Sequence, residues 1–321
     1  MTFRFGMWTT VLVLAATSAL AQPYPARPVR LIVPTTPGGS VDTLARTIGP
    51  RLSERWGQQV VVDNRSGAGG TIAAEFTARS APDGYTLMIG TIASLATNVS
   101  LQQKLPYDPL RDFAPVTLVA TQNLVLTVHP SVPAKSVREL VKLAKARPGQ
   151  LAFASAGNGT GSHLSGELFK QLAGVDVLHI PYKGVAPALV DVISGQVSMS
   201  FPSILTSLPQ VHSGRLRALA VSGAQRSAAL PDLPTMMEAG VKDYESATWY
   251  GIVAPVATPR EIVNKLNAEI AAILKQPDTR ERIARDGADP VGNTPQQFGA
   301  FMKSEIEKWR KVIRAAGILP G

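Results

Sequence analysis

The stretch VRLIVPTTPGGSVDTLA, residues 29–45, joins an apolar strand-like run to a helical pattern through a turn rich in proline and glycine. Residues 29–33 are almost all apolar, and from Val41 the apolar residues recur at helical spacing. The order of strand, turn and helix repeats over 60–79, and Asp83-Gly84 precedes another strand-like run at 86–89. Strands that alternate with helices are typical of an α/β fold with a mainly parallel sheet.

The same pattern restarts after residue 120 and continues to about residue 222, and a third block with a strand and long helices begins near 246. The length of 321 residues favours two domains. We therefore predict that residues 22–120 with 246–321 form one domain and that residues 121–245 form an inserted one. Each domain is expected to be a doubly wound, mainly parallel sheet with helices on both faces. A continuous order of two domains fits the periodicity nearly as well.

Composition excludes several classes of function. The chain has no cysteine and four histidines, which excludes disulfides, thiol nucleophiles and cysteine-bearing metal sites. The formal net charge is +9, but the basic residues are scattered as singles and pairs, so we expect no nucleic-acid partner. No nucleophile–base motif such as G-x-S-x-G occurs, and no carboxylates are paired by spacing. We predict no catalysis, no metal and no cofactor.

The first 21 residues differ from the rest and indicate a secretory signal peptide. Arg4 supplies the positive region, residues 11–16 (VLVLAA) the apolar region, and Ala19-Leu20-Ala21 a cleavage site before Gln22. No later apolar run reaches about 18 residues, the length that a bilayer requires. We therefore expect a soluble, periplasmic mature protein, cleaved near Ala21-Gln22.

Two turns between a strand and a helix are candidate anion sites. Pro37-Gly38-Gly39-Ser40 is one, and residues 155–163 (SAGNGTGSH) are the other. Backbone N–H groups at a helix start lack intrahelical partners and attract anions. The second turn has Gly157 and Gly159, but it fits neither the dinucleotide nor the P-loop motif. Either turn could equally be a structural loop, with Ser40 or Gly39 as an ordinary helix cap.

Other side chains have two interpretations each. The 90–94 segment follows a strand and is expected to reach the same edge of the sheet, so all three segments would converge on one cleft. His163 and Glu167 share a helix face and could ligate a metal, although a local pair is the favoured interpretation. Trp249 and Tyr250 could stack on a ligand, but core or hinge packing is more common for such residues.

Beyond these motifs, the chain resembles the Bug (TctC-like) family, the extracytoplasmic solute receptors of bacterial tripartite tricarboxylate transporters. The resemblance covers nearly the whole mature chain, in family order. The segments that carry it are YPARPVRLIVPTTPGGSVDTLAR (24–46), GQQVVVDNRSGAGG (57–70), APDGYTLMIGT (81–91), LPYDPLRDFAPVTLVA (105–120), HPSVPAKSVREL (129–140), FASAGNGTGSHLSGELFK (153–170), HIPYKGVAPAL (179–189), GRLRALAVS (214–222) and ALPDLPT (229–235).

The resemblance implies a two-domain Venus-flytrap fold of the periplasmic-binding-protein type that binds one small carboxylate and delivers it, as a monomer, to membrane permease subunits. Two departures stand out: Thr35 replaces an aromatic residue, and Ser198 and Pro202 replace acids that would suit an ammonium group. An amino-acid ligand is therefore less expected than a simple carboxylate. The predicted ligand-binding residues are Pro37, Gly38, Gly39, Ser40, Thr91, Ser94, Ser155, Asn158, Gly159, Thr160, His163, Pro202 and Ser203.

Two other functions remain open. One is a ligand-binding partner of a membrane sensor kinase, and the other is a periplasmic enzyme that uses the same cleft.

For the first turn we expect a valine at Gly39 to abolish binding, because it would fill the place of the anion and disfavour a positive φ.

Overall fold

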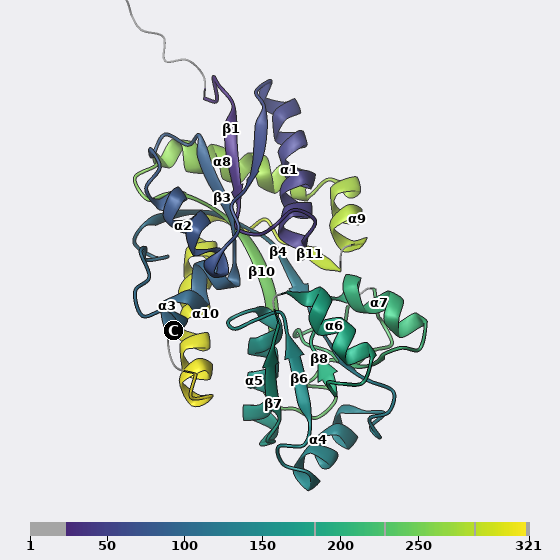
Figure 1. Cartoon of the computed structure of the whole chain (residues 1–321). Coiled ribbons are helices and arrows are strands. Elements are labelled where there is room, and N and C mark those ends of the chain that lie inside the picture. Colours follow the sequence, from purple (N-terminus) through teal and green to yellow (C-terminus); the bar gives the residue numbers. More distant parts are fainter. Residues whose placement is uncertain (1–23, 183, 228, 286, 319–321) are drawn as a thin grey trace, which may run out of the picture.

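The computed structural model describes residues 24–182, 184–227, 229–285 and 287–318, and the predicted signal peptide with its cleavage site before Gln22 lies outside this range. Within it, the chain forms two α/β units, one above the other in Figure 1. No helix in the described residues is long and apolar enough to cross a membrane.

The upper unit is built on a six-stranded sheet with the order β11-β4-β10-β3-β1-β2. Helices α1, α8 and α9 pack on one face of this sheet, and α2 and α10 pack on the other. Its elements are β1 (Val29–Val33), α1 (Ser40–Trp56), β2 (Val60–Asn64), η1 (Ala68–Gly70), α2 (Thr71–Ala78), β3 (Thr86–Thr91), η2 (Ala93–Thr97), α3 (Asn98–Leu101), β4 (Phe113–Asn123), β10 (Ala247–Pro255), α8 (Arg260–Leu274), α9 (Pro277–Arg285), β11 (Ala288–Pro290) and α10 (Pro295–Ala315).

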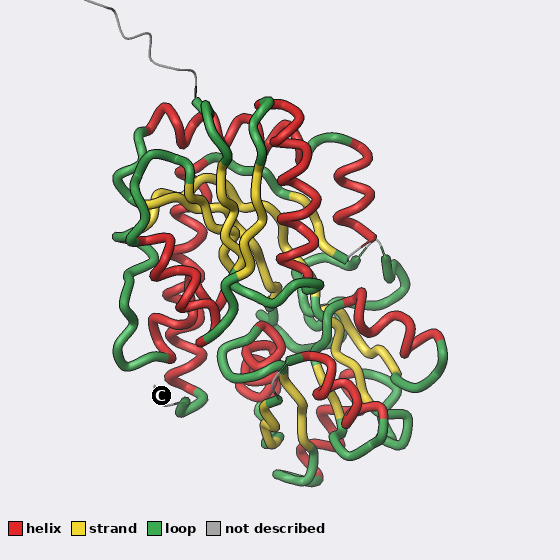
Figure 2. The backbone as a smooth tube through the Cα atoms, turned by 45° about the horizontal axis from the view of Figure 1, so that its top comes forward, coloured by secondary structure: helices red, strands yellow, loops and turns green. Residues whose placement is uncertain are grey.

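The lower unit is built on a five-stranded sheet with the order β7-β6-β8-β5-β9. Helices α4 and α5 cover one face and α6 and α7 the other, which Figure 2 shows as red helices around yellow strands. Its elements are β5 (Val125–Val128), α4 (Val137–Ala146), β6 (Ala152–Ser155), α5 (Gly161–Ala173), β7 (Leu178–Pro181), α6 (Val185–Ile193), β8 (Met199–Ser200), α7 (Ile204–His212) and β9 (Arg217–Val221).

Both sheets are mixed, whereas the sequence pattern predicted mainly parallel ones. In the first sheet β1 runs parallel to β2 and β3, but β10 is antiparallel to both β3 and β4. In the second sheet β5 is antiparallel to β8 and β9. The reason is the crossing between the units: β4 leaves the first sheet toward the second, and β10 returns beside it in the opposite direction. The α/β class with helices on both faces is confirmed.

The first sheet takes its strands from residues 29–123 and 247–290, and the second from residues 125–221. Strand β4 continues to Asn123, beyond the boundary at 120 that the sequence suggested, and Asn123 pairs with Ala247. The division into residues 22–120 with 246–321 and 121–245 stays a prediction that agrees with this order of strands.

Strand β10 is packed tightly against the last helix. Trp249 is buried edge-on against the rings of Phe298 and Phe301, and its indole N–H donates to Glu305 Oε2 at 2.8 Å. Gly251 lies next to the fully buried Phe298, and a Cβ atom at Gly251 would overlap that ring. Glycine is therefore required here for close packing between strand and helix.

We predict that Gly251→Ala lowers the free energy of unfolding by about 1–3 kcal/mol, because overpacking forces Phe298 out of its place. Urea denaturation measures the change. Gly49→Ala in α1 is the matched control, since a Cβ there meets Val60 Cγ1 at an ordinary 3.5 Å, and alanine favours the helix. A Gly251→Ala protein as stable as the parent would contradict this account of the packing.

Candidate functional site

A cleft with two lobes lies between the two α/β units. Lobe A has a volume of about 460 Å³ and lobe B about 290 Å³. The residues that line both lobes form what we term the floor: Gly39, Ser40, Ala156, Thr160, Gly161, Val185, Thr248 and Tyr250. Lobe A is further lined by Pro34, Thr35, Thr36, Val41, Gly67, Gly69, Gly70, Thr91, Ile92 and Ala93. Lobe B is further lined by Gly38, Thr43, Gln122, Leu124, Ser162, Phe201, Pro202, Ser203, Leu205 and Thr206.

The start of α1 brings backbone N–H groups to the floor. No side chain caps this helix, and the N–H groups of Ser40, Val41 and Asp42 have no hydrogen-bond partner in the described part of the chain. Such groups carry the partial positive charge of the helix start. Gly39 has an ordinary extended conformation (φ −82°), and the positive φ of this turn belongs to Gly38 (90°). Our expectation of a positive φ at Gly39 was therefore wrong.

Asp42 holds the first turn in shape. Its Oδ2 accepts hydrogen bonds from the N–H of Gly38 at 2.9 Å and from Arg46 Nε at 3.0 Å, while its Oδ1 accepts from Asn64 Nδ2 at 2.9 Å. Burial alone would raise the pKa of Asp42, but the three hydrogen bonds and the charge of Arg46 together hold it below its usual value. The N–H of Gly38 is thus already occupied, and the unpartnered N–H groups of this turn begin at Gly39 in the described part of the chain.

The start of α5 supplies the facing N–H groups. Thr160 caps this helix by accepting from the N–H of His163, and its hydroxyl donates to the carbonyl of Gly157 at 2.7 Å. The hydroxyl of Ser162 accepts from the N–H of Ala156 at 3.0 Å. Within the described residues, the N–H groups of Gly161 and Ser162 remain without a partner. Two helix starts, one from each unit, therefore face the same cleft.

Strand β10 completes the floor with Thr248 and Tyr250, which lie on one face of the strand while Trp249 points to the opposite one. The hydroxyl of Tyr250 donates to Gln122 Oε1 on β4 at 2.8 Å. Burial raises the pKa of Tyr250 to about 12, so its hydroxyl stays protonated at neutral pH. Our preference for core packing holds for both residues, because Trp249 and Tyr250 are each buried in a hydrophobic core, and Tyr250 in addition lines the cleft. The alternation of side chains along the strand was the signal that could have separated their two faces.

Seven predicted residues line the cleft: Gly38, Gly39, Ser40, Thr91, Thr160, Pro202 and Ser203. The others lie outside this lining. The hydroxyl of the buried Ser94 accepts a hydrogen bond from the N–H of Thr91, and His163 Nδ1 accepts one from the N–H of Gly159. These groups therefore stabilise the turns without lining the cleft. The residues outside the lining are Pro37, Ser94, Ser155, Asn158, Gly159 and His163.

Sequence reasoning missed the loop that forms the far wall of lobe A. Gly67, Gly69 and Gly70 all have a positive φ, and each contributes to the lining. The segment NRSGAGG was interpreted only as a turn between β2 and α2, although its glycine content resembles that of the two turns that were singled out. None of the described residues that line the two lobes carries a charged side chain.

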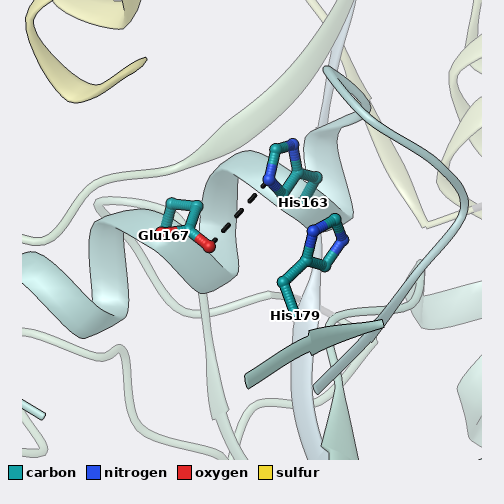
Figure 3. A group of neighbouring side chains, drawn as sticks. All are labelled: His163, Glu167 and His179. Carbon is teal, nitrogen blue, oxygen red and sulfur yellow. Dashed lines mark ion pairs between the residues drawn. The ribbon is translucent and has the colours of Figure 1, made fainter. Parts of the chain in front are cut away.

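His163, Glu167 and His179 form a cluster behind the α5 turn (Figure 3). The two imidazole rings are stacked, with centroids 4.0 Å apart and planes only 16° from parallel. One nitrogen of each ring is hydrogen-bonded: His163 Nδ1 accepts from the N–H of Gly159, and His179 Nε2 lies 2.6 Å from Ser155 Oγ. Glu167 is paired with Lys170 at 2.9 Å, and its Oε1 lies 3.9 Å from His163 Nε2. A metal must lie near the plane of each ligating ring at about 2.0–2.1 Å, which nearly parallel stacked rings do not permit.

Comparisons with known proteins identify the family of this chain. A family model described as "Tripartite tricarboxylate transporter family receptor" matches residues 44–318. The chain belongs to this family. Protein BugT of Bordetella pertussis is 40% identical over 311 residues, which cover 95% of each chain. The prediction made from the quoted segments is thus confirmed.

Solved structures of similar receptors have the same two-domain fold. The structure of R. palustris Rpa4515 with adipate is 43% identical, has a TM-score of 0.84, and is matched over 93% of this chain and 100% of that one. MatC from Rhodopseudomonas palustris with bound malate is 34% identical, with a TM-score of 0.79 and coverage of 90% and 100%. The two-domain α/β fold of periplasmic binding proteins is therefore confirmed for this family member.

The pKa values of the two histidines in the cluster predict that the stability of the chain depends on pH. Burial, then the charges of His179 and Lys170, lower the pKa of His163 to about 3, and burial, then Lys170, lowers the pKa of His179 to about 4. Both values lie below the value of about 6.5 for an unfolded chain, so the unfolded state binds protons first as pH falls. The contribution of the two neutral histidines to the free energy of unfolding is complete above pH ~6.5. It is lost as pH falls from there toward the folded-state pKa values of about 4 and about 3.

We predict that the free energy of unfolding drops between pH 7 and pH 5 by roughly 1–2 kcal/mol for the buried His163, and by less for the half-buried His179, where solvent screens the charge. Urea denaturation at both pH values measures the drop. The double variant His163→Gln/His179→Gln should be less stable at pH 7 but lose less stability on acidification. An equal loss in parent and double variant would show that other groups cause the pH dependence.

Proposed function

We propose that this chain is a periplasmic solute receptor that binds a small carboxylate on the floor of the cleft and delivers it to the permease subunits of a tripartite tricarboxylate transporter. The observation that carries the proposal is the pair of helix starts, α1 and α5, whose N–H groups lack partners in the described chain and line one cleft from two sides. We also propose that the chain is periplasmic and that its first 21 residues are a signal peptide.

The energetics suit reversible capture of an anion. A hydrogen bond to a charged group contributes roughly 1.5–3 kcal/mol, so three or four of them account for micromolar affinity, about 8 kcal/mol. These donors are backbone groups, fixed by the helices before the ligand arrives, so little ordering cost opposes binding. The bound adipate and malate of the two similar receptors support a carboxylate here as well.

A receptor fits the lining better than an enzyme does. The described floor offers hydroxyl and backbone N–H groups, with no histidine, lysine or carboxylate to move a proton. Tyr250 has a pKa raised to about 12, which makes it a poor base at neutral pH. As a ligand-binding partner of a sensor kinase, the chain would use the same cleft. If the chain were an enzyme, product analysis after incubation with a bound carboxylate would reveal turnover.

The test is a thermal-shift screen of mono-, di- and tricarboxylates, followed by calorimetry with the acid that stabilises most. A ligand at 100 times its dissociation constant stabilises by about 2.7 kcal/mol, which a melting curve resolves. The neutral diamide of the same acid is the control and should give no shift. If no carboxylate in the screen shifts the melting temperature, the proposal fails.

We predict that Gly39→Val weakens the binding of that acid by at least about 100-fold, because a branched side chain would occupy the floor beside the α1 start. The fold should persist, since φ at Gly39 is ordinary and a Cβ there meets only Thr35 Oγ1 at 3.9 Å. Ser40→Ala keeps the backbone N–H and should cost less than about 5-fold. A folded Gly39→Val protein that binds like the parent would place the site elsewhere.

A further inference from the structure

The turn before α5 contacts the first unit at Gly159. The N–H of Gly159 donates to His163 Nδ1 of its own unit at 3.0 Å, and its C=O accepts from Thr97 Oγ1, in η2 of the first unit, at 3.2 Å. Thr97 is 0% exposed and His163 is 2% exposed, so both hydrogen bonds are shielded from water. We term these two hydrogen bonds the Gly159 bridge, because they connect a buried histidine of one unit to a buried threonine of the other.

The bridge requires glycine at its centre. Gly159 has a φ of +76°, in the left-handed region that favours glycine, and a Cβ atom there would lie 2.4 Å from Leu101 Cδ1 in α3. Leu101 packs against the buried core, which limits its room to move aside. The backbone of the second unit therefore approaches the first unit more closely here than a residue with a side chain would allow.

The paired histidines hold the turn from within the second unit. The ring of His163 stacks on that of His179 (Figure 3). His179 Nε2 lies 2.6 Å from Ser155 Oγ, which accepts the N–H of Gly157 at 3.1 Å. Because His163 Nδ1 accepts a hydrogen bond, the proton of the neutral ring is on Nε2, which lies 3.9 Å from Glu167 Oε1. Burial lowers the pKa of His163 to about 3, so Nδ1 remains an acceptor at neutral pH.

The residues that follow Gly159 belong to the floor of the cleft. Thr160 and Gly161 line both lobes, and the N–H of Gly161 has no partner in the described part of the chain. Thr97, Gly159 and His163 lie outside the lining. On the side of the first unit, the first residue of η2 lines lobe A. The bridge thus ties one wall of lobe A to the part of the floor that the second unit supplies.

From this arrangement we infer that Thr97 and His163 are positioning residues for the cleft: through Gly159 they hold the start of α5 against η2 and so set the distance between the two helix starts. The effect on affinity rests on the proposed function, and the inference goes beyond it because neither residue lines the cleft. A helix start that is already held in place needs little ordering when an anion binds, whereas a loosened one lowers the affinity by the cost of ordering it.

The first test compares Thr97→Val, which keeps the shape of the side chain but lacks the hydroxyl, with Thr97→Ser, which lacks a methyl group but keeps the hydroxyl. Calorimetry titrates adipate and malate into the parent chain, and then the tighter of the two into each variant. We expect Thr97→Val to weaken binding by about 10-fold and Thr97→Ser by less than about 3-fold, because one buried hydrogen bond contributes on this order. Parent-like affinity in Thr97→Val, or equal losses in the two variants, would overturn the inference.

A second pair of variants tests the other hydrogen bond of the bridge. His163→Asn places an amide oxygen near the position of Nδ1, whereas His163→Leu has no acceptor for the N–H of Gly159. We expect the leucine variant to bind the same acid about 10-fold more weakly than the parent and the asparagine variant to recover most of that loss. A folded His163→Leu chain that binds as tightly as the parent would contradict the role of His163.

The distance between the units is measured without any ligand. Since the chain has no cysteine, spin labels can be attached at Glu54→Cys on α1 and Val190→Cys on α6, two exposed positions outside the cleft lining. The distribution of label distances should shift and broaden in Thr97→Val and match the parent in Thr97→Ser. If neither acid binds the parent and the wider carboxylate screen is negative, the proposed function fails, and this measurement decides on the bridge alone: an unchanged distribution in Thr97→Val overturns it.

Discussion

Unpartnered backbone N–H groups at the starts of two helices are the constraint on which this site depends. A helix leaves its first N–H groups without intrahelical acceptors, and in α1 no side chain caps them. Asp42 fixes the preceding turn through Gly38, Asn64 and Arg46, while the N–H groups from Gly39 to Asp42 stay without a partner in the described chain. In the proposed function these groups attract the anion, since no charged side chain occurs among the described residues that line the floor.

The two helix starts face the same cleft because of the strands that connect the two units. Strand β4 ends at Asn123, and β5 begins at Val125 in the second sheet, while β10 returns between β3 and β4. Thr248 and Tyr250 on β10 form the base of the cleft at this crossing, and Gly161 at the start of α5 packs beside Thr248. Packing of Trp249 and Gly251 against α10 holds β10 in place, so core and floor are two faces of one strand.

Much of the fold was predictable because apolar periodicity and glycine turns report directly on buried strands and helix starts. The pattern from 29 to 45 predicted β1, its turn and the start of α1, which lies at Ser40, one residue before the predicted helical spacing begins. The sequence pattern indicated long helices after residue 246 but gave no signal for α9, because only Thr279 and Ile283 of its nine residues are buried. The antiparallel entry of β10 was missed because strand direction depends on where the chain returns in space. The contribution of Thr248 to the cleft was missed for the same reason, whereas alternation along β10 and the glycines of residues 67–70 were local signals for Tyr250 and for the loop.

Backbone amide chemical shifts test the central claim most directly. In an ¹⁵N-labelled sample titrated with the carboxylate that binds most tightly, the amide protons of Ser40, Val41 and Asp42 in α1 and of Gly161 and Ser162 in α5 should move downfield together, with one common dissociation constant, because charged acceptors deshield the protons that they bind. Saturable shifts confined to other amides, with these five unchanged, would contradict the account and place the anion away from the helix starts.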